Sequence, residues 1–126
     1  MCMLAITEFQ EIKRYKTVYV MRTVYENSIK SPCQYNNWII GERLTVKEQI
    51  NIKVGDEVNG GVFHVFTTKK MLMDVIKSGE WAHLNVKPFK ALAFGKIAYG
   101  KLMAFDGMHN GMRCAGVTSL KLIERI

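Results

Sequence analysis

The alternation of residue types in residues 15–25 constrains the fold of this chain more than any other feature. One set of alternate positions carries three valines and two cations, and the other carries mostly tyrosine and threonine. β-Branched and aromatic residues favour the pleated surface of a sheet, and a period of two is typical of a strand. The two sets are Lys16, Val18, Val20, Arg22 and Val24, and then Tyr15, Thr17, Tyr19, Met21, Thr23 and Tyr25. We therefore predict a strand in which Arg22 shares a face with the valines.

A second strand is predicted over residues 62–66, directly after Gly60-Gly61. It is apolar on both faces, which is typical of a strand with neighbours on both sides. Thr67 or Thr68 suits the N-cap of a following helix, and Gly79 suits its C-terminal end. The apolar stripe of that helix is Met71, Leu72, Val75 and Ile76.

Most of the remaining chain is predicted to be extended, over residues 28–31, 38–40, 44–46, 89–105, 112–117 and 120–126. Gly95 or Gly100 is expected to mark a bulge. Residues 7–13 fit either a helical turn or a strand, and residues 47–59 fit a polar loop with one short extended piece. One helix among several strands predicts an α+β fold, with a mostly antiparallel sheet and one main amphipathic helix packed on it. We expect a single domain over residues 1–126.

The composition indicates a cytoplasmic protein. With 126 residues, 48% of them hydrophobic, the chain can build one core. No apolar run reaches the length of a membrane span, and Glu8 and Glu11 follow the start too closely for a secretory signal. The cysteines (Cys2, Cys33 and Cys114) form no CxxC pair or Cys/His cluster. We therefore expect no disulfide framework, metal or other cofactor.

The positive charge of the chain favours an anionic partner. Lysine and arginine number 18 against 11 acidic residues, a net charge of +7. Such a balance suits a nucleotide, a nucleic acid or an acidic protein face, although it also serves solubility alone.

Tyrosines and cations meet near the predicted first strand. Tyr15, Tyr19 and Tyr25 share one strand face, and cations and further aromatic residues follow in the chain. A base can stack on such rings while arginine or lysine holds a phosphate. An ordinary tyrosine-rich sheet face is the alternative. The predicted ligand-binding residues are Arg22, Lys30, Ser31, Tyr35, Trp38, His64 and Arg113.

No set of residues predicts catalysis. Ser31-Pro32 lacks a GxSxG turn, Gly60-Gly61 does not extend into a phosphate-binding loop, and no paired carboxylates occur at useful positions. His64 suits a general base or a phosphate contact because it titrates near neutral pH. The alternative for His64 is a half-buried imidazole satisfied by a backbone carbonyl.

The order of motifs resembles a loose group of small uncharacterised phage and prophage proteins. The resemblance covers roughly residues 15–123 and rests on short motifs, which are Tyr15-Lys16, Ser31-Pro32, Tyr35, Gly41-Glu42, His64-Val65-Phe66, residues 94–100 and Arg113-Cys114-Ala115. It implies a phage accessory protein that acts on the host, including as an inhibitor of bacterial defence. If the protein is phage-encoded, its location is the host cytoplasm.

The layout also resembles, more faintly, the ADP-ribosyltransferase fold. That resemblance would assign Arg14 or Tyr15, Ser31 and Phe66-Thr67-Thr68 to an NAD site. The late catalytic glutamate of that fold has no good counterpart, because Glu124 lies almost at the end of the chain.

We therefore expect a non-catalytic accessory protein that binds an anionic partner, whether a nucleotide signal, nucleic acid or nucleoprotein, and so antagonises a host defence or regulatory system. An NAD-using transferase is the first alternative. A structural or homo-oligomer-forming accessory protein is the second, with a host protein as a further conceivable partner.

Overall fold

The computed structural model describes residues 2–26, 28–30, 37–46, 57–58, 62–79, 81–104 and 113–126. Within residues 2–5, 57–58 and 102–104 it describes the backbone and not the side chains. The long strands are β1 (Cys2–Tyr25), β7 (Val86–Ala104) and β8 (Arg113–Arg125). The short strands are β2 (Ser28–Lys30), β3 (Asn37–Trp38), β4 (Arg43–Thr45), β5 (Glu57–Val58) and β6 (Phe63–Val65).

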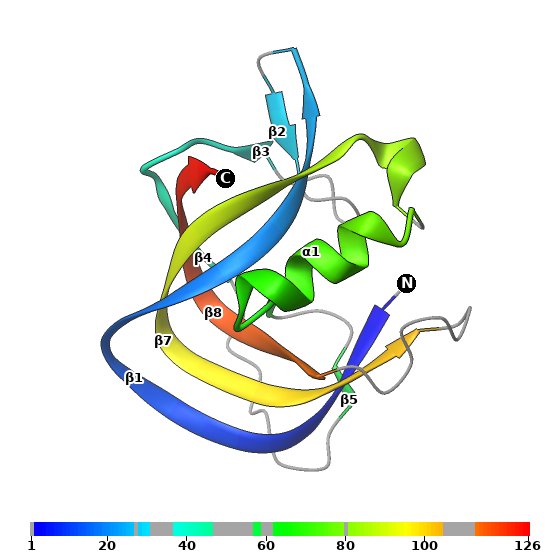
Figure 1. Ribbon diagram of the computed structural model, residues 1–126. Coiled ribbons are helices and arrows are strands. Elements are labelled where there is room, and N and C mark those ends of the chain that lie inside the picture. The colour runs from blue at the N-terminus through cyan, green and yellow to red at the C-terminus, as the bar shows by residue number, and fades with distance from the viewer. Residues whose placement is uncertain are drawn as a thin grey trace.

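The strands form one curled antiparallel sheet. Its order is β3-β2-β1-β7-β8-β4, while β5 pairs with β1 and β6 pairs with β8. Figure 1 shows β1, β7 and β8 bending together along their length. Just after β6, Phe66 reaches back to β1, where it exchanges two backbone hydrogen bonds of 2.8 Å with Tyr19. The sheet is therefore a half-barrel, and β6 connects its β8 side back to β1.

The long strands bend because extra residues interrupt their pairing. β1 shifts register against β7 at residues 6–8 and 12–16, and β7 shifts against β8 at residues 94–97. Gly95 lies in the last of these bulges with φ of +82°. Bulges increase twist and bend a strand, so the sheet can wrap around its own core. The prediction of a bulge at Gly95 or Gly100 is thus confirmed at Gly95.

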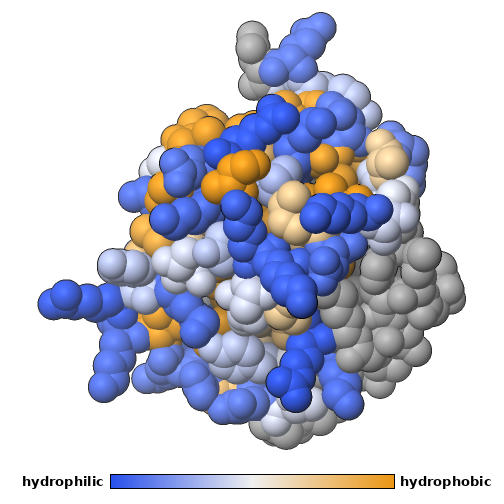
Figure 2. Space-filling view, in the orientation of Figure 1, coloured by the Kyte–Doolittle hydropathy of each residue, from blue (hydrophilic) through white to orange (hydrophobic). Residues whose placement is uncertain are grey.

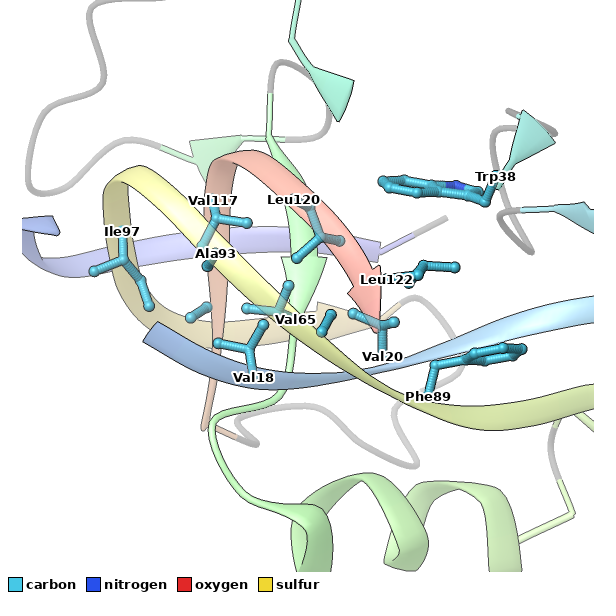
Figure 3. Close-up of a cluster of buried hydrophobic side chains, with 12 residues drawn as sticks. Val18, Val20, Trp38, Val65, Phe89, Ala93, Ile97, Val117, Leu120 and Leu122 are labelled. Carbon is cyan, nitrogen blue, oxygen red and sulfur yellow. The ribbon is translucent and has the colours of Figure 1, made fainter. Parts of the chain in front are cut away.

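The main hydrophobic core lies on the inner face of this curl. Alternate residues of β1, including Val18 and Val20, meet Ala91 and Ala93 of β7 and Leu120 of β8 there. Figure 3 shows this cluster on the side of β1 and β7 that faces away from the helix, with Trp38 at one end. The predicted assignment of the two faces of residues 15–25 is confirmed, because Val18 and Val20 are buried in this core and Val24 packs against it.

A smaller hydrophobic cluster lies on the other face of β1, beneath the helix α1 (Lys69–Lys77). Leu72 and Val75 of the helix pack there against Phe66, with Tyr19 and Met21 of β1 partly buried beside them. The N-cap is Thr68, whose side chain accepts a hydrogen bond of 3.2 Å from the Met71 backbone. A short 3₁₀ turn (Ala82–Leu84) leads from the helix region to β7.

The predicted α+β class is wrong. The fold is mostly antiparallel β-structure that buries a core within its own curl, and the nine-residue helix covers one flank of it. The stretch over residues 7–13 is part of β1, and residues 112–126 contribute one strand, β8, where two were predicted. The physical reason is that residues 13–15 and Gly95 are bulges inside strands, whereas polar residues and glycine more often separate elements. The predicted turns at Gly60-Gly61 and residues 107–111 lie outside the described residues.

Candidate functional site

Arg22 lies on the inner face of β1, in line with the buried valines that precede it. The side chain is only 5% exposed. Arginine is rarely buried to this degree unless a partner balances its charge. A buried guanidinium of this kind depends on the groups around it.

The guanidinium lies against one ring of an aromatic pair. Its central carbon, Cζ, lies 4.6 Å from the ring centroid of Trp38, in the range of a cation–π contact. Trp38 in turn meets Phe63 edge to face, with ring centroids 5.1 Å apart. We refer to Arg22, Trp38 and Phe63 as the arginine cluster. It combines residues from β1, β3 and β6, three strands that are well separated in the sequence.

The hydrogen bonds of Arg22 leave part of the guanidinium unsatisfied. Nη1 donates to the backbone oxygen of Met21 at 2.7 Å. Nε is buried and has no hydrogen-bond partner. Among the described residues no carboxylate forms a salt bridge with Arg22. The protein therefore holds a buried cation without a counter-charge in its described part.

Burial lowers the pKa of Arg22 to about 9, because the surroundings stabilise the charged form less than water does. The side chain is therefore still protonated at neutral pH. An uncompensated buried charge of this kind destabilises a folded protein by several kcal/mol.

The backbone at Met21 explains why the guanidinium sits at this point. Ile126 donates a backbone hydrogen bond of 3.1 Å to the oxygen of Pro88, so the backbone groups of Pro88 point toward β8. Met21 lies opposite Pro88 in the β1–β7 ladder, and its backbone groups therefore point away from β7. On that side β1 is bonded to β6 at Tyr19 and to β2 from Thr23 onward. Arg22 donates a hydrogen bond to the Met21 oxygen at the seam of β1, between the position bonded to Phe66 and the positions bonded to β2.

His64 lies close enough to this cluster to sense its charge. It pairs with Gly116 of β8, and its Nε2 is buried without a hydrogen-bond partner. Burial, and after it the positive charge of Arg22, lower the pKa of His64 below 6.5. The imidazole is therefore neutral at pH 7, and the expected backbone partner is not found at Nε2.

The structure brings together three of the predicted ligand-binding residues, which are Arg22, Trp38 and His64. Lys30 pairs with Thr23, so it lies on the opposite face of the sheet from Arg22. Arg113 is exposed and pairs with Lys101, at the far end of β7 from the position that faces Arg22. Ser31 and Tyr35 lie outside the described residues.

The predicted tyrosine face does not form one stacking surface. Tyr19 is partly buried beneath α1, whereas Tyr15 and Tyr25 are 59% and 54% exposed. Arg22 points to the other side of the strand. The rings that meet cations are instead spread over the sheet, as in Lys96 above Phe9, with Nζ 5.5 Å from the ring centroid.

Two contributors to the site were not predicted from the sequence. Phe63 was predicted only as part of the apolar strand over residues 62–66, and the Met21 backbone oxygen was not predicted to take part. The only available signal was that Arg22 shares a period-two face with three valines, which indicates burial of a cation. That signal does not say which rings cover it.

Other kinds of site have less support. No group of three His, Cys, Asp or Glu residues within the described ranges could hold a metal ion. The same ranges contain no helix long and apolar enough to cross a membrane. Glu124 is exposed near the end of β8, where it pairs with Lys90, and this position does not place a rigid carboxylate near Arg22. On the face shown in Figure 2, apolar and hydrophilic side chains are interspersed.

Comparison of the chain with protein-family models, with curated proteins and with solved structures found no match.

Proposed function

We propose that this protein is a non-catalytic binding protein whose anionic partner neutralises Arg22. The observation that carries the proposal is the 5% exposed guanidinium with an unpaired Nε and no carboxylate partner among the described residues. Buried charges are normally paired, and a charge left unpaired is typical of a site that a ligand completes.

The surroundings of Arg22 support binding more than catalysis. The cation is held by a ring on one side and by a backbone oxygen at Nη1, so its position is defined before any ligand arrives. The neighbouring imidazole of His64 is neutral at pH 7. It therefore adds no second buried charge to the site. No nucleophile–base pair accompanies these groups in the described residues.

The proposed biological setting is that of a phage-type accessory protein in the host cytoplasm. It follows from the resemblance of the motif order to phage and prophage proteins and from the net charge of +7. Binding a nucleotide signal or another anionic host component would deprive a host defence or regulatory system of that component.

A thermal-shift screen against mononucleotides, cyclic oligonucleotides and short RNAs tests this proposal. A ligand that binds the folded state stabilises it by about 2.7 kcal/mol at one hundred times its dissociation constant. We expect at least one compound to raise the melting temperature of the wild-type protein and not that of Arg22→Met, each measured against its own ligand-free baseline. Arg14→Met, at an exposed position of β1, is the matched control and should respond like the wild type. Equal shifts in wild type and Arg22→Met would overturn the proposal.

A further inference from the structure

The guanidinium of Arg22 has one edge that the protein does not use. Arginine offers five N–H donors in a planar fork. Nη1 donates to the Met21 oxygen, and Cζ lies over the ring of Trp38. Nε is buried without a partner, and no described residue accepts a hydrogen bond from Nη2. The remaining Nε–Nη2 edge has the spacing that binds two oxygens of one phosphate or carboxylate side-on.

The depth of this edge limits what can reach it. At 5% exposure, Arg22 cannot be contacted by the backbone of a polymer that continues past the site in both directions. A group at the end of a molecule can enter, because only one substituent has to lead back to solvent. The site should therefore admit a phosphate monoester or a carboxylate and exclude a phosphodiester.

The aromatic residues do not offer a surface for base stacking here. Trp38 is 3% exposed, one part of it faces Arg22 and its ring meets Phe63. Recognition at this point therefore depends on the charged end group.

The segments that flank this position on β1 are held by few backbone hydrogen bonds. Phe66, which follows the three-residue strand β6, makes one pair of backbone hydrogen bonds with Tyr19 of β1, and β2 also has three residues. Segments with few backbone hydrogen bonds open at lower free energy than the long ladders of the same protein.

We infer that the Nε–Nη2 edge of Arg22 is a side-on subsite for a single terminal oxyanion, admitted at the seam of β1 between β6 and β2. This inference rests on the proposed function and deepens it by naming the chemical class of the ligand. Phosphate monoesters and carboxylates share the required pair of oxygens, and the experiment distinguishes them.

Adenosine 5′-monophosphate and cyclic 3′,5′-adenosine monophosphate form a matched pair of probes, since they share base and sugar and differ as monoester and diester. Sodium acetate probes the carboxylate class. Each is titrated into ¹⁵N-arginine-labelled protein, and the Nε–H signal of Arg22 is followed by NMR. We expect the monoester to shift this signal saturably and the diester to require at least about tenfold more ligand. A shift with acetate as well would extend the subsite to carboxylates.

Arg22→Lys keeps the positive charge and removes the fork, so it should weaken monoester binding by about tenfold or more, measured by thermal shift or calorimetry. Arg14→Lys is the matched control and should bind like the wild type. Equal binding of monoester and diester, or full binding by Arg22→Lys, would overturn the inference while leaving anion binding at Arg22 in place. Failure of every anion to move the Arg22 signal would overturn the inference and the proposed function together.

Discussion

Two arginines of this protein lie against aromatic rings, yet their surroundings differ. Arg43 of β4 has its Cζ 4.2 Å from the ring centroid of Phe94, and its Nε donates to the Ser119 side chain at 2.7 Å. Arg43 is exposed, so water stabilises the rest of its charge. Arg22 lies over Trp38 at a similar distance of 4.6 Å, but it is buried and its Nε has no partner.

The difference teaches that stacking on a ring does not by itself satisfy a guanidinium. A cation–π contact contributes about 0.5–2 kcal/mol, whereas removing the charge from water costs considerably more. Arg43 joins β4 to β8 through the hydrogen bond from its Nε, which is sufficient as a structural role. The corresponding Nε of Arg22 has no hydrogen-bond partner, which is unfavourable for the stability of the folded protein. Such unfavourable arrangements are expected where a protein binds a ligand.

The largest difference should appear when the two rings are removed. Trp38→Ala should lower the free energy of unfolding by about 3–5 kcal/mol, because a buried ring is replaced by a cavity. Phe94→Ala should cost at most about half as much, since that ring is partly exposed. Urea-induced unfolding measures both values. Equal losses would show that the two stacks are equivalent in energy.

Replacing the two arginines should give effects of opposite sign. Arg22→Met removes an uncompensated buried charge while keeping most of the apolar volume, so it should raise the free energy of unfolding by about 1–3 kcal/mol. Arg43→Met removes the hydrogen bond to Ser119 and should lower it by about 1 kcal/mol. Denaturant unfolding of both variants at pH 7 and moderate salt measures the difference. A loss of stability in Arg22→Met would identify Arg22 as a structural residue.

Gly95→Ala tests the Arg43 side of the comparison alone. Gly95 has φ of +82°, and a Cβ there would lie 2.6 Å from the Thr118 side-chain oxygen. Gly41 has φ of +87° with nothing within 4 Å of the same position. We expect Gly95→Ala to cost about 1–3 kcal/mol and Gly41→Ala about 1 kcal/mol, because the second suffers backbone strain without a clash. Ligand binding at Arg22 should be unchanged in both, and a loss of binding in Gly95→Ala would link the two regions.

The smallest expected effect is a pH dependence that His64 contributes. Since its pKa is lowered in the folded state, the unfolded chain takes up a proton below pH 6.5 that the folded protein does not. The free energy of unfolding should therefore fall as the pH falls below 6.5, by at most about 1.4 kcal/mol per pH unit from this group. His64→Gln should reduce this slope and His83→Gln, at an exposed position, should leave it unchanged.

Arg22→Met tests whether the charge of Arg22 affects the pKa of His64. Without the Arg22 charge the pKa of His64 should move upward, although burial still keeps it below 6.5. A titration of the His64 ring followed by NMR measures this. An unchanged pKa would mean that the two groups do not interact.

The sequence predicted those features that depend on neighbouring residues. Local periodicity and capping predict the two faces of residues 15–25 and the helix over Lys69–Lys77 with its threonine cap. They also predict that the short strand around Phe63–Val65 is covered on both faces. Trp38 and His64 were predicted with Arg22 as ligand-binding residues, and the structure places them near that arginine.

The fold class and the surroundings of Arg22 could not be predicted in the same way. Residues 13–15 and Gly95 interrupt the period of two, so the lengths of β1 and β7 were hidden, and the helix was given too large a part. Lys30 and Arg113 were grouped with Arg22 because no local pattern tells which face or which end of a curled sheet a cation will occupy.

The sequence by itself thus determined the alternation that turns Arg22 inward with the valines, because the direction of a side chain in a strand follows from the pleat alone. Only the tertiary structure decided that Trp38 lies against this arginine with Phe63 behind it, and that Met21 accepts a hydrogen bond from one of its nitrogens. The tertiary structure also decided that no carboxylate of the described residues meets the other edge. These contacts join strands distant in sequence, and their geometry depends on how far the sheet curls before β6 connects its two sides.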